Sequence, residues 1–106
     1  MPTSIRSFAL VVLGLGPDLA LAQPAATPAD FQAALWAASC MACHGTDGRA
    51  EGSGLALAGK PEQELYGFLA AFKAGQRSAT IMHQHAKGYS DEELRRIARY
   101  FAGVKP

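Results

Sequence analysis

The sequence is short of most features that identify a protein class at a glance. Its 106 residues include two cysteines and one tryptophan, and ten basic against nine acidic side chains leave a formal net charge of only +1. Because basic and acidic side chains are nearly equal in number, the composition excludes a strongly basic nucleic-acid surface. It also includes no acidic tail. No segment alternates like a β-strand and none repeats, so we expect a single small all-α domain.

Long apolar runs are also lacking. The run FALVVLGLG (8–16) stops at a proline and an aspartate, well short of the roughly 20 residues that cross a bilayer. Arg6 precedes this run, and Ala20 to Ala22 give the small-x-small pattern after which a signal peptidase cuts. We therefore predict a cleaved signal peptide in residues 1–22 and an exported, periplasmic domain in residues 23–106 with no membrane span. The alternative, an uncleaved anchor, needs a longer run.

The first helix is predicted to begin after Thr27, which can cap it, and to end close to Cys40. Its apolar side chains repeat at helical spacing, at Phe31, Ala34, Leu35 and Ala38. Five glycines in residues 45–59 then predict a loop, and residues 76–88 predict a second irregular stretch.

Two further helices are predicted. One follows Pro61 and stops at Gly75, with an apolar face made of Leu65, Phe68, Leu69 and Phe72. The last follows Ser90, which forms a capping box with Glu93, and its inward stripe consists of Leu94, Ile97, Ala98 and Phe101. Three short helices and two long loops give a thin core, and small domains of this kind usually need a disulfide, a metal or a large cofactor.

The motif CMACH supplies a candidate for that cofactor. Cys40, Cys43 and His44 have the Cys-x-x-Cys-His spacing of a c-type haem attachment site. Two thiols three residues apart can each bond a vinyl group on one edge of the porphyrin. The histidine that follows then reaches the iron as an axial ligand. We therefore predict one covalently bound haem c.

Three other interpretations of the two cysteines were weighed. A thioredoxin-like redox pair needs a βαβ context, which the sequence does not show. A disulfide across two residues constrains little of the unfolded chain. A zinc site could combine the cysteines with histidines, yet His83 and His85 lack the spacing of a zinc-finger pair.

The sequence offers three candidate residues for the second axial ligand. Met1 leaves with the signal peptide and Met41 lies between the two cysteines, so Met82 is the methionine available. His83 and His85 are its rivals, and either would give a bis-histidine haem of lower reduction potential. A haem with an open axial site is the third possibility. We predict Met82 as the ligand.

These residues carry a resemblance to a known family. CMACHG, LAG at 57–59 and a single late methionine resemble a class I cytochrome c, and the resemblance covers nearly all of residues 23–106. More narrowly, TIM at 80–82 and AKGYSDEEL at 86–94 are similar to the cytochrome subunit of flavocytochrome c sulfide dehydrogenase. The resemblance implies three to five short helices around one haem, and a flavoprotein partner that contains FAD and oxidises sulfide.

The resemblance also implies roles for individual residues. It implies Cys40 and Cys43 as thioether anchors and His44 and Met82 as axial ligands. It further implies that an aromatic residue of the last helix, Tyr100 or Phe101, packs against the first helix. Many family members have a proline whose carbonyl accepts the proximal histidine's N–H, but GSGL at 52–55 has none, so a carbonyl of Ser53 or Gly54 is expected to replace it.

Three functions follow from these features. The leading hypothesis is a periplasmic one-electron carrier, not itself an enzyme, that accepts electrons as a subunit of the sulfide-oxidising flavoprotein. The second is a free soluble shuttle that serves an oxidase, reductase or peroxidase. The third is a sensor that binds a gas or a peroxide at the haem. Basic residues of the central third are candidates for a partner-binding face: Lys60, Lys73, Arg77 and Lys87.

Overall fold

The computed structural model describes residues 27–106, and these form helices joined by loops, with no strand among them. In chain order the elements are α1 (Pro28–Ala38), α2 (Met41–His44), the 3-10 turn η1 (Thr46–Gly48), α3 (Glu62–Lys73), α4 (Met82–Lys87) and α5 (Asp91–Ala102). The predicted all-α class is confirmed. The predicted signal peptide lies outside the described residues, and no helix within them is long and apolar enough to span a bilayer.

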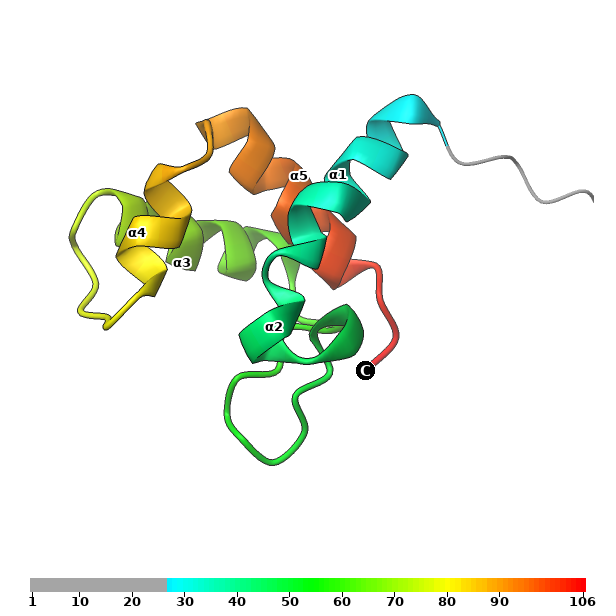
Figure 1. The fold of residues 1–106 in the computed structure, drawn as a ribbon, viewed down its shortest axis with the longest axis horizontal. Helices are drawn as coiled ribbons and strands as arrows, with labels where there is room; N and C mark the ends of the chain where they lie inside the picture. The colour runs from blue at the N-terminus through cyan, green and yellow to red at the C-terminus, as the bar shows by residue number, and fades with distance from the viewer. Residues whose placement is uncertain (1–26) are drawn as a thin grey trace, which may run out of the picture.

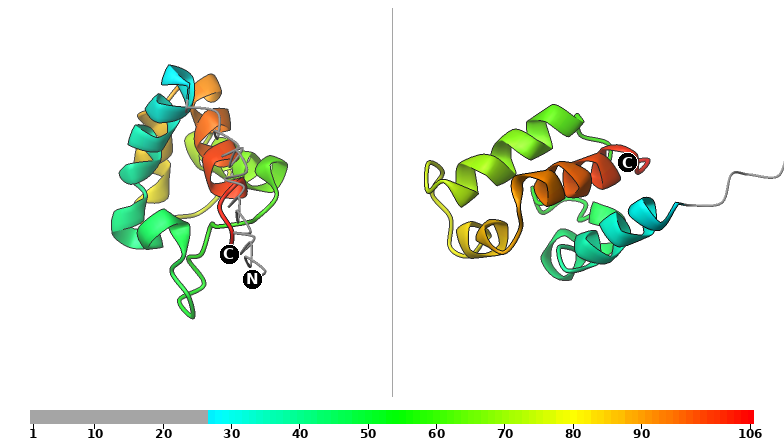
Figure 2. Two further views of the ribbon diagram at one scale, coloured as in Figure 1. Left: turned by 90° about the vertical axis from the view of Figure 1, so that its right-hand side faces the viewer. Right: turned by 90° about the horizontal axis from the view of Figure 1, so that it is seen from above.

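Helix α5 lies at the centre of the molecule, with α1 on one side of it and α3 on the other (Figures 1 and 2). A capping box starts it, because Ser90 Oγ accepts from the Glu93 backbone N–H and the Glu93 carboxylate accepts from the Ser90 N–H. All four residues of its predicted inward stripe are buried: Leu94, Ile97, Ala98 and Phe101. The prediction for this helix is confirmed.

Helix α1 begins as predicted but buries a different side. Thr27 caps it, in a capping box with Asp30. The exposed fractions of Phe31 and Leu35 are 65% and 54%, whereas Ala37 is fully buried against α5. The apolar repeat that predicts this helix is therefore not the face that the helix buries. Small side chains at the contact allow α1 and α5 to approach closely, and larger side chains there would push them apart.

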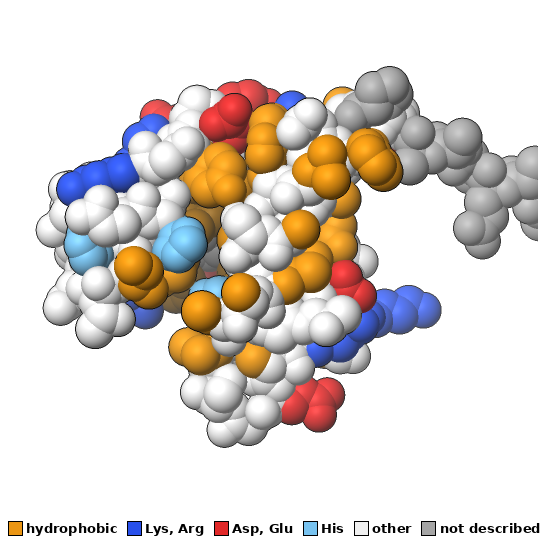
Figure 3. All heavy atoms as spheres, in the orientation of Figure 1, with side chains coloured by type: hydrophobic (Ala, Val, Ile, Leu, Met, Phe, Trp, Pro, Cys, Tyr) orange, Lys and Arg blue, Asp and Glu red, His pale blue; other side chains and the backbone are white. Residues whose placement is uncertain are grey.

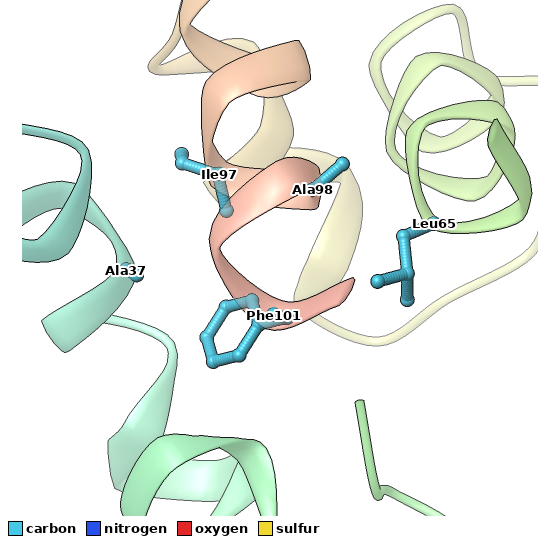
Figure 4. Close-up of a cluster of buried hydrophobic side chains, with 5 residues drawn as sticks. All are labelled: Ala37, Leu65, Ile97, Ala98 and Phe101. Carbon is cyan, nitrogen blue, oxygen red and sulfur yellow. The ribbon is translucent and has the colours of Figure 1, made fainter. Parts of the chain in front are cut away.

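The core is small and spans three helices. Figure 4 shows its members converging from α1, α3 and α5: Ala37, Leu65, Ile97, Ala98 and Phe101. Helix α3 contributes only one of them, Leu65, although its apolar face is four residues long. The other three, Phe68, Leu69 and Phe72, are half-buried and line a cavity instead. The fold thus leaves an apolar helix face turned toward an internal space.

The glycine-rich loop after α2 folds back onto the end of α5. Gly48 is buried with φ +74°, and its amide carbonyl accepts from the N–H of Leu57 at 2.8 Å. A Cβ at Gly48 would lie 2.8 Å from a ring carbon of Phe101, so only glycine fits without a shift. The N–H of Gly59 then donates to the Phe101 carbonyl at 2.9 Å. This loop therefore closes one end of the cavity.

Three short elements were not predicted. The structure has α2 within the CMACH motif, the turn η1 inside the glycine-rich loop, and α4 inside the stretch 76–88 that was expected to be irregular. Six residues are too few to display a helical period, and α4 buries only Ala86. Its sequence therefore carried no signal that separates it from a loop.

Candidate functional site

The two cysteines lie where α1 ends and the single turn α2 begins. The N–H of Cys40 donates to the Ala37 carbonyl at 3.0 Å, and the Cys40 carbonyl accepts from the N–H groups of Cys43 and His44 at 3.3 and 3.0 Å. Both thiols are free, so the disulfide alternative is not realised in this structure. This turn places Cys40 half-buried at the cavity wall and leaves Cys43 exposed.

Burial raises the pKa of the Cys40 thiol above its usual range, and a long contact of 4.0 Å with the Ser39 hydroxyl offsets this only in part. The sulfur therefore stays a neutral thiol at neutral pH. A neutral sulfur against an apolar wall suits a thioether anchor better than a thiolate metal ligand. Within residues 27–106, no three His, Cys, Asp or Glu side chains are grouped as a metal site, so the zinc alternative gains no support there.

His44 is oriented by a backbone carbonyl. Its Nδ1 lies 2.5 Å from the carbonyl oxygen of Leu55. Because a carbonyl oxygen can only accept, Nδ1 carries the proton, and the lone pair of Nε2 is free to bind a metal. A carbonyl partner of this kind fixes the ring and raises the basicity of the ligand.

The orienting carbonyl belongs to Leu55, so the expectation of Ser53 or Gly54 is wrong. Gly54 has φ +74°, which turns the chain at that point. The Ser53 hydroxyl donates to the Ala50 carbonyl at 2.7 Å and accepts from the Leu55 N–H at 3.2 Å. This small turn brings a backbone carbonyl to His44 in place of the carbonyl of the absent proline. The feature of the sequence that indicated the turn was the pair of glycines around Ser53.

A deep apolar cavity lies beside these residues. Figure 3 shows a hollow with hydrophobic side chains at its edges. The space that no atom fills amounts to about 830 Å3, part of it open to solvent. Its lining comes from the CMACH turn, the following loop, α3, α4 and α5: Cys40, His44, Gly54, Leu55, Ala56, Leu57, Lys60, Leu65, Phe68, Leu69, Phe72, Arg77, Met82, Ile97, Ala98 and Phe101.

The cavity brings together three of the four predicted site residues. Met82, at the start of α4, lines it with Cys40 and His44, although 38 positions separate the histidine from the methionine. Of the two rival ligands, His83 is half-buried and His85 is exposed, and neither lines the cavity. The structure thus places a thioether, and not a second imidazole, at this wall.

The charged groups at the cavity are both cations. Lys60 and Arg77 line it, and among residues 27–106 no acidic side chain does. The guanidinium carbon of Arg77 lies 4.0 Å from the ring centre of Phe68 and 5.2 Å from that of Phe72, which holds it against the wall by cation–π contact. Both are among the four basic residues predicted as candidates for a partner-binding face, and Arg77 is also exposed to solvent.

The cavity fits a haem. A porphyrin presents two apolar faces, a metal that takes imidazole and thioether ligands, and two carboxylates at one edge. The apolar walls, His44 Nε2, the Met82 sulfur and the cations Lys60 and Arg77 match those groups in kind. Cys40 and Cys43 would supply the two covalent bonds.

The sequence matches a known family over most of its length. The family described as cytochrome c oxidase, cbb3-type, subunit III, matches residues 15–101. This match includes CMACH, the loop that orients His44, and Met82.

Several curated proteins are similar to the chain. The cytochrome subunit of sulfide dehydrogenase from Chlorobaculum tepidum is 37% identical over 99 residues, which cover 89% of this chain and 90% of that protein. Cytochrome c-553 from Nitratidesulfovibrio vulgaris is 38% identical over 99 residues, 88% and 94% of the two chains. The thiosulfate dehydrogenase electron acceptor of Thiomonas intermedia is 39% identical over 84 residues, which cover 76% of this chain and 39% of that protein.

Proposed function

Since this chain belongs to the cytochrome c family, we propose that it is the haem subunit that accepts electrons from a sulfide-oxidising flavoprotein in the periplasm. Electron transfer by one covalently bound haem c is the function of the protein, which makes it a carrier and not an enzyme. When bound, the haem supplies an iron that cycles between the ferric and ferrous states.

The proposed roles of the site residues follow from their positions. Cys40 and Cys43 anchor the haem through thioether bonds. His44 binds the iron through Nε2, because its Nδ1–H donates a hydrogen bond to the Leu55 carbonyl. Met82 binds from α4, the other wall of the cavity. A thioether ligand raises the reduction potential, which suits an acceptor of electrons from a flavin.

The observation that carries the subunit proposal is similarity over most of the length of both chains. The likeness to the sulfide dehydrogenase subunit covers 89% of this chain and 90% of the other, and it spans both the attachment motif and the segment that follows Met82. The test is gentle purification of the protein from its native host. We expect flavin absorbance to co-elute with the haem spectrum, and the haem to be reduced when sulfide is added.

A free electron shuttle is the second candidate, and the similarity to cytochrome c-553 favours it. Native mass spectrometry of the same preparation separates the two. A complex of this chain with a flavoprotein supports the subunit proposal. A solitary monomer that is inert to sulfide supports the shuttle. The sensor hypothesis requires that Met82 can leave the iron, with His83 or His85 helping as a distal donor, and neither histidine lines the cavity.

The partner face is proposed to include Lys87. Of the four basic candidates, Lys73 is paired with Asp91 at 3.0 Å, and Lys60 and Arg77 line the cavity. Lys87 is exposed at the end of α4. Reversing its charge should slow association with the flavoprotein and weaken the salt dependence of the rate. An unchanged rate and salt dependence would remove Lys87 from this face.

Export is proposed from the sequence of residues 1–22. The measurement is the intact mass of the protein recovered from the periplasm. A chain that begins at Gln23 and carries one haem supports cleavage of a signal peptide. A chain that retains residues 1–22 and sediments with membranes would identify an anchor.

A further inference from the structure

Helix α4, which carries Met82, is weakly held on its N-terminal side. Its N-cap, Ile81, makes no side-chain cap, and Ala86 is its one buried residue. Residues 77–80, all described, take part in no backbone hydrogen bond. The helix packs mainly on α3. Apart from the cation–π contacts of Arg77, the segment 77–80 that leads into Met82 therefore adds little to the packing of α4 on α3.

The C-terminal side of α4 is held by one residue, Tyr89. Its N–H donates to the Ala86 carbonyl at 3.3 Å, and its hydroxyl lies 2.9 Å from Ser39 Oγ. Its carbonyl accepts from Lys73 Nζ at 2.8 Å, and the same ammonium pairs with Asp91 at 3.0 Å. Tyr89 is half-buried and packs against the core. The side chain of Tyr89 thus bonds to the residue that ends α1, and its backbone carbonyl bonds to α3.

The direction of the Tyr89–Ser39 bond follows from proton counting. Ser39 has a single hydroxyl proton, which it donates to the Trp36 carbonyl at 2.9 Å. Tyr89 must therefore be the donor to Ser39 Oγ. Ser39 immediately precedes Cys40, which lines the cavity. The bond joins the segment that follows Met82 to the segment that anchors the haem.

From this juxtaposition we infer that Tyr89 is a positioning residue for Met82, a role that rests on the proposed ligation of iron by that methionine. Its hydroxyl bond to Ser39 holds α4 toward the end of α1, and Lys73 fixes the backbone between them. The sulfur of Met82 then stays within reach of the iron. Without the bond, α4 keeps its packing on α3 but loses its link to the end of α1, and an external ligand competes more easily for the iron.

The test is competition by imidazole for the ferric iron, followed through the sulfur-to-iron absorption band of the whole haem protein. The loss of one hydrogen bond corresponds to a change in equilibrium constant of about fivefold. Tyr89→Phe should therefore bind imidazole about fivefold more tightly than the wild type. Ser39→Ala should do the same, and the double variant should show no more than either single change because both remove the same bond.

The matched control is Tyr66→Phe. Tyr66 is half-buried on α3, and no hydrogen bond of its hydroxyl is found within residues 27–106, so imidazole affinity should stay at the wild-type value. Far-UV circular dichroism and urea unfolding are recorded on every variant. A merely structural role lowers the urea midpoint and leaves imidazole affinity unchanged, and that result overturns the inference. Additive effects of the Tyr89 and Ser39 changes also overturn it.

Met82→Ala distinguishes failure of the inference from failure of the proposed ligation. A sulfur-to-iron band that is present in the wild type and lost in Met82→Ala establishes the ligand. Wild-type imidazole affinity in Tyr89→Phe then refutes the positioning role alone. A band that survives Met82→Ala refutes the ligation and the positioning role together.

Discussion

Single residues of the loop after CMACH carry much of the site's geometry. The Leu55 carbonyl sets the tautomer of His44, and Gly48 lets the loop lie against Phe101. Asp47, the one non-glycine residue with positive φ within residues 27–106, accepts a hydrogen bond from the Tyr100 hydroxyl at 3.0 Å. These contacts depend on backbone conformation, and two of them can be tested by substitution.

Gly48→Ala should destabilise the fold more than the same change at Gly52. Both glycines have positive φ, so each substitution carries a backbone cost of about 1–2 kcal/mol. At Gly48 the new methyl group also meets the Phe101 ring at 2.8 Å, whereas Gly52 has open space. We expect an additional loss of about 1–3 kcal/mol at Gly48, as overpacking usually costs. Equal free energies of unfolding for the two variants would contradict this.

Tyr100 makes stability depend on alkaline pH. Burial and the hydrogen bond to the Asp47 carboxylate raise the pKa of Tyr100 above its ordinary value of 10.0. The unfolded chain therefore loses this proton first. The contribution to stability is fully present below pH 10, and it is lost as the pH rises through the higher pKa of the folded state.

The measurement is urea unfolding of the wild type and of Tyr100→Phe from pH 8 to pH 11. The stability advantage of the wild type should shrink above about pH 10, the reference value for tyrosine. In Asp47→Asn, the pKa of Tyr100 should fall toward its ordinary value, and asparagine tolerates the positive φ at this position. A stability advantage of the wild type that stays constant across this range would refute the assignment.

At the scale of elements, helix α1 shows why burial is hard to predict from spacing alone. The larger residues, Phe31 and Leu35, repeat at helical intervals and yet are exposed, while Ala33 and Ala37 face α5. We expect Leu35→Ala to change the free energy of unfolding by less than about 0.5 kcal/mol, as surface substitutions usually do. Ala37→Leu should cost about 1–3 kcal/mol by overpacking. Urea unfolding checks both, and the reverse order would contradict the observed packing.

Helices with clear end signals were predictable from sequence. The cap at Thr27 and the capping box at Ser90 are present as expected, and Gly75 has the left-handed φ of +72° after α3. The chemistry of the attachment motif was also readable, because haem attachment depends on a fixed local spacing.

Features set by tertiary contacts could not be read in the same way. Helix α4 is too short to show a period, so its helical state follows from packing on α3. The choice of Leu55 as the orienting carbonyl depends on a turn whose geometry is decided by Gly54. The placement of Arg77 at the cavity depends on two phenylalanines from the preceding helix. None of these contacts can be inferred from a regular spacing of residues in the sequence.

The molecule as a whole is built around a cavity and not around a continuous core. The residues of α3 that face inward mostly meet this space, and the buried cluster has only a few large side chains, chiefly Phe101, Leu94 and Ile97. Small domains need an additional element to be stable. We therefore expect the haem to complete the fold as well as to carry the electron.

Removing both anchors should expose this dependence. Because thioether bonds cannot form in a Cys40→Ala, Cys43→Ala double variant, we expect a haem-free preparation of it to lose much of its helical signal. The loss should include the cooperative urea transition. Far-UV circular dichroism with and without denaturant measures both. A haem-free variant that unfolds cooperatively at the wild-type midpoint would contradict a fold completed by haem.

The most direct measurement of the central claim is the ferric optical spectrum of the intact haem protein beside two variants. We predict a sulfur-to-iron band in the wild type, its loss in Met82→Ala, and its retention when His83 and His85 are both replaced by alanine. That outcome assigns the electron-carrying iron to the cavity between His44 and Met82. A band absent from the wild type, or lost in the double histidine variant and kept in Met82→Ala, would contradict the account.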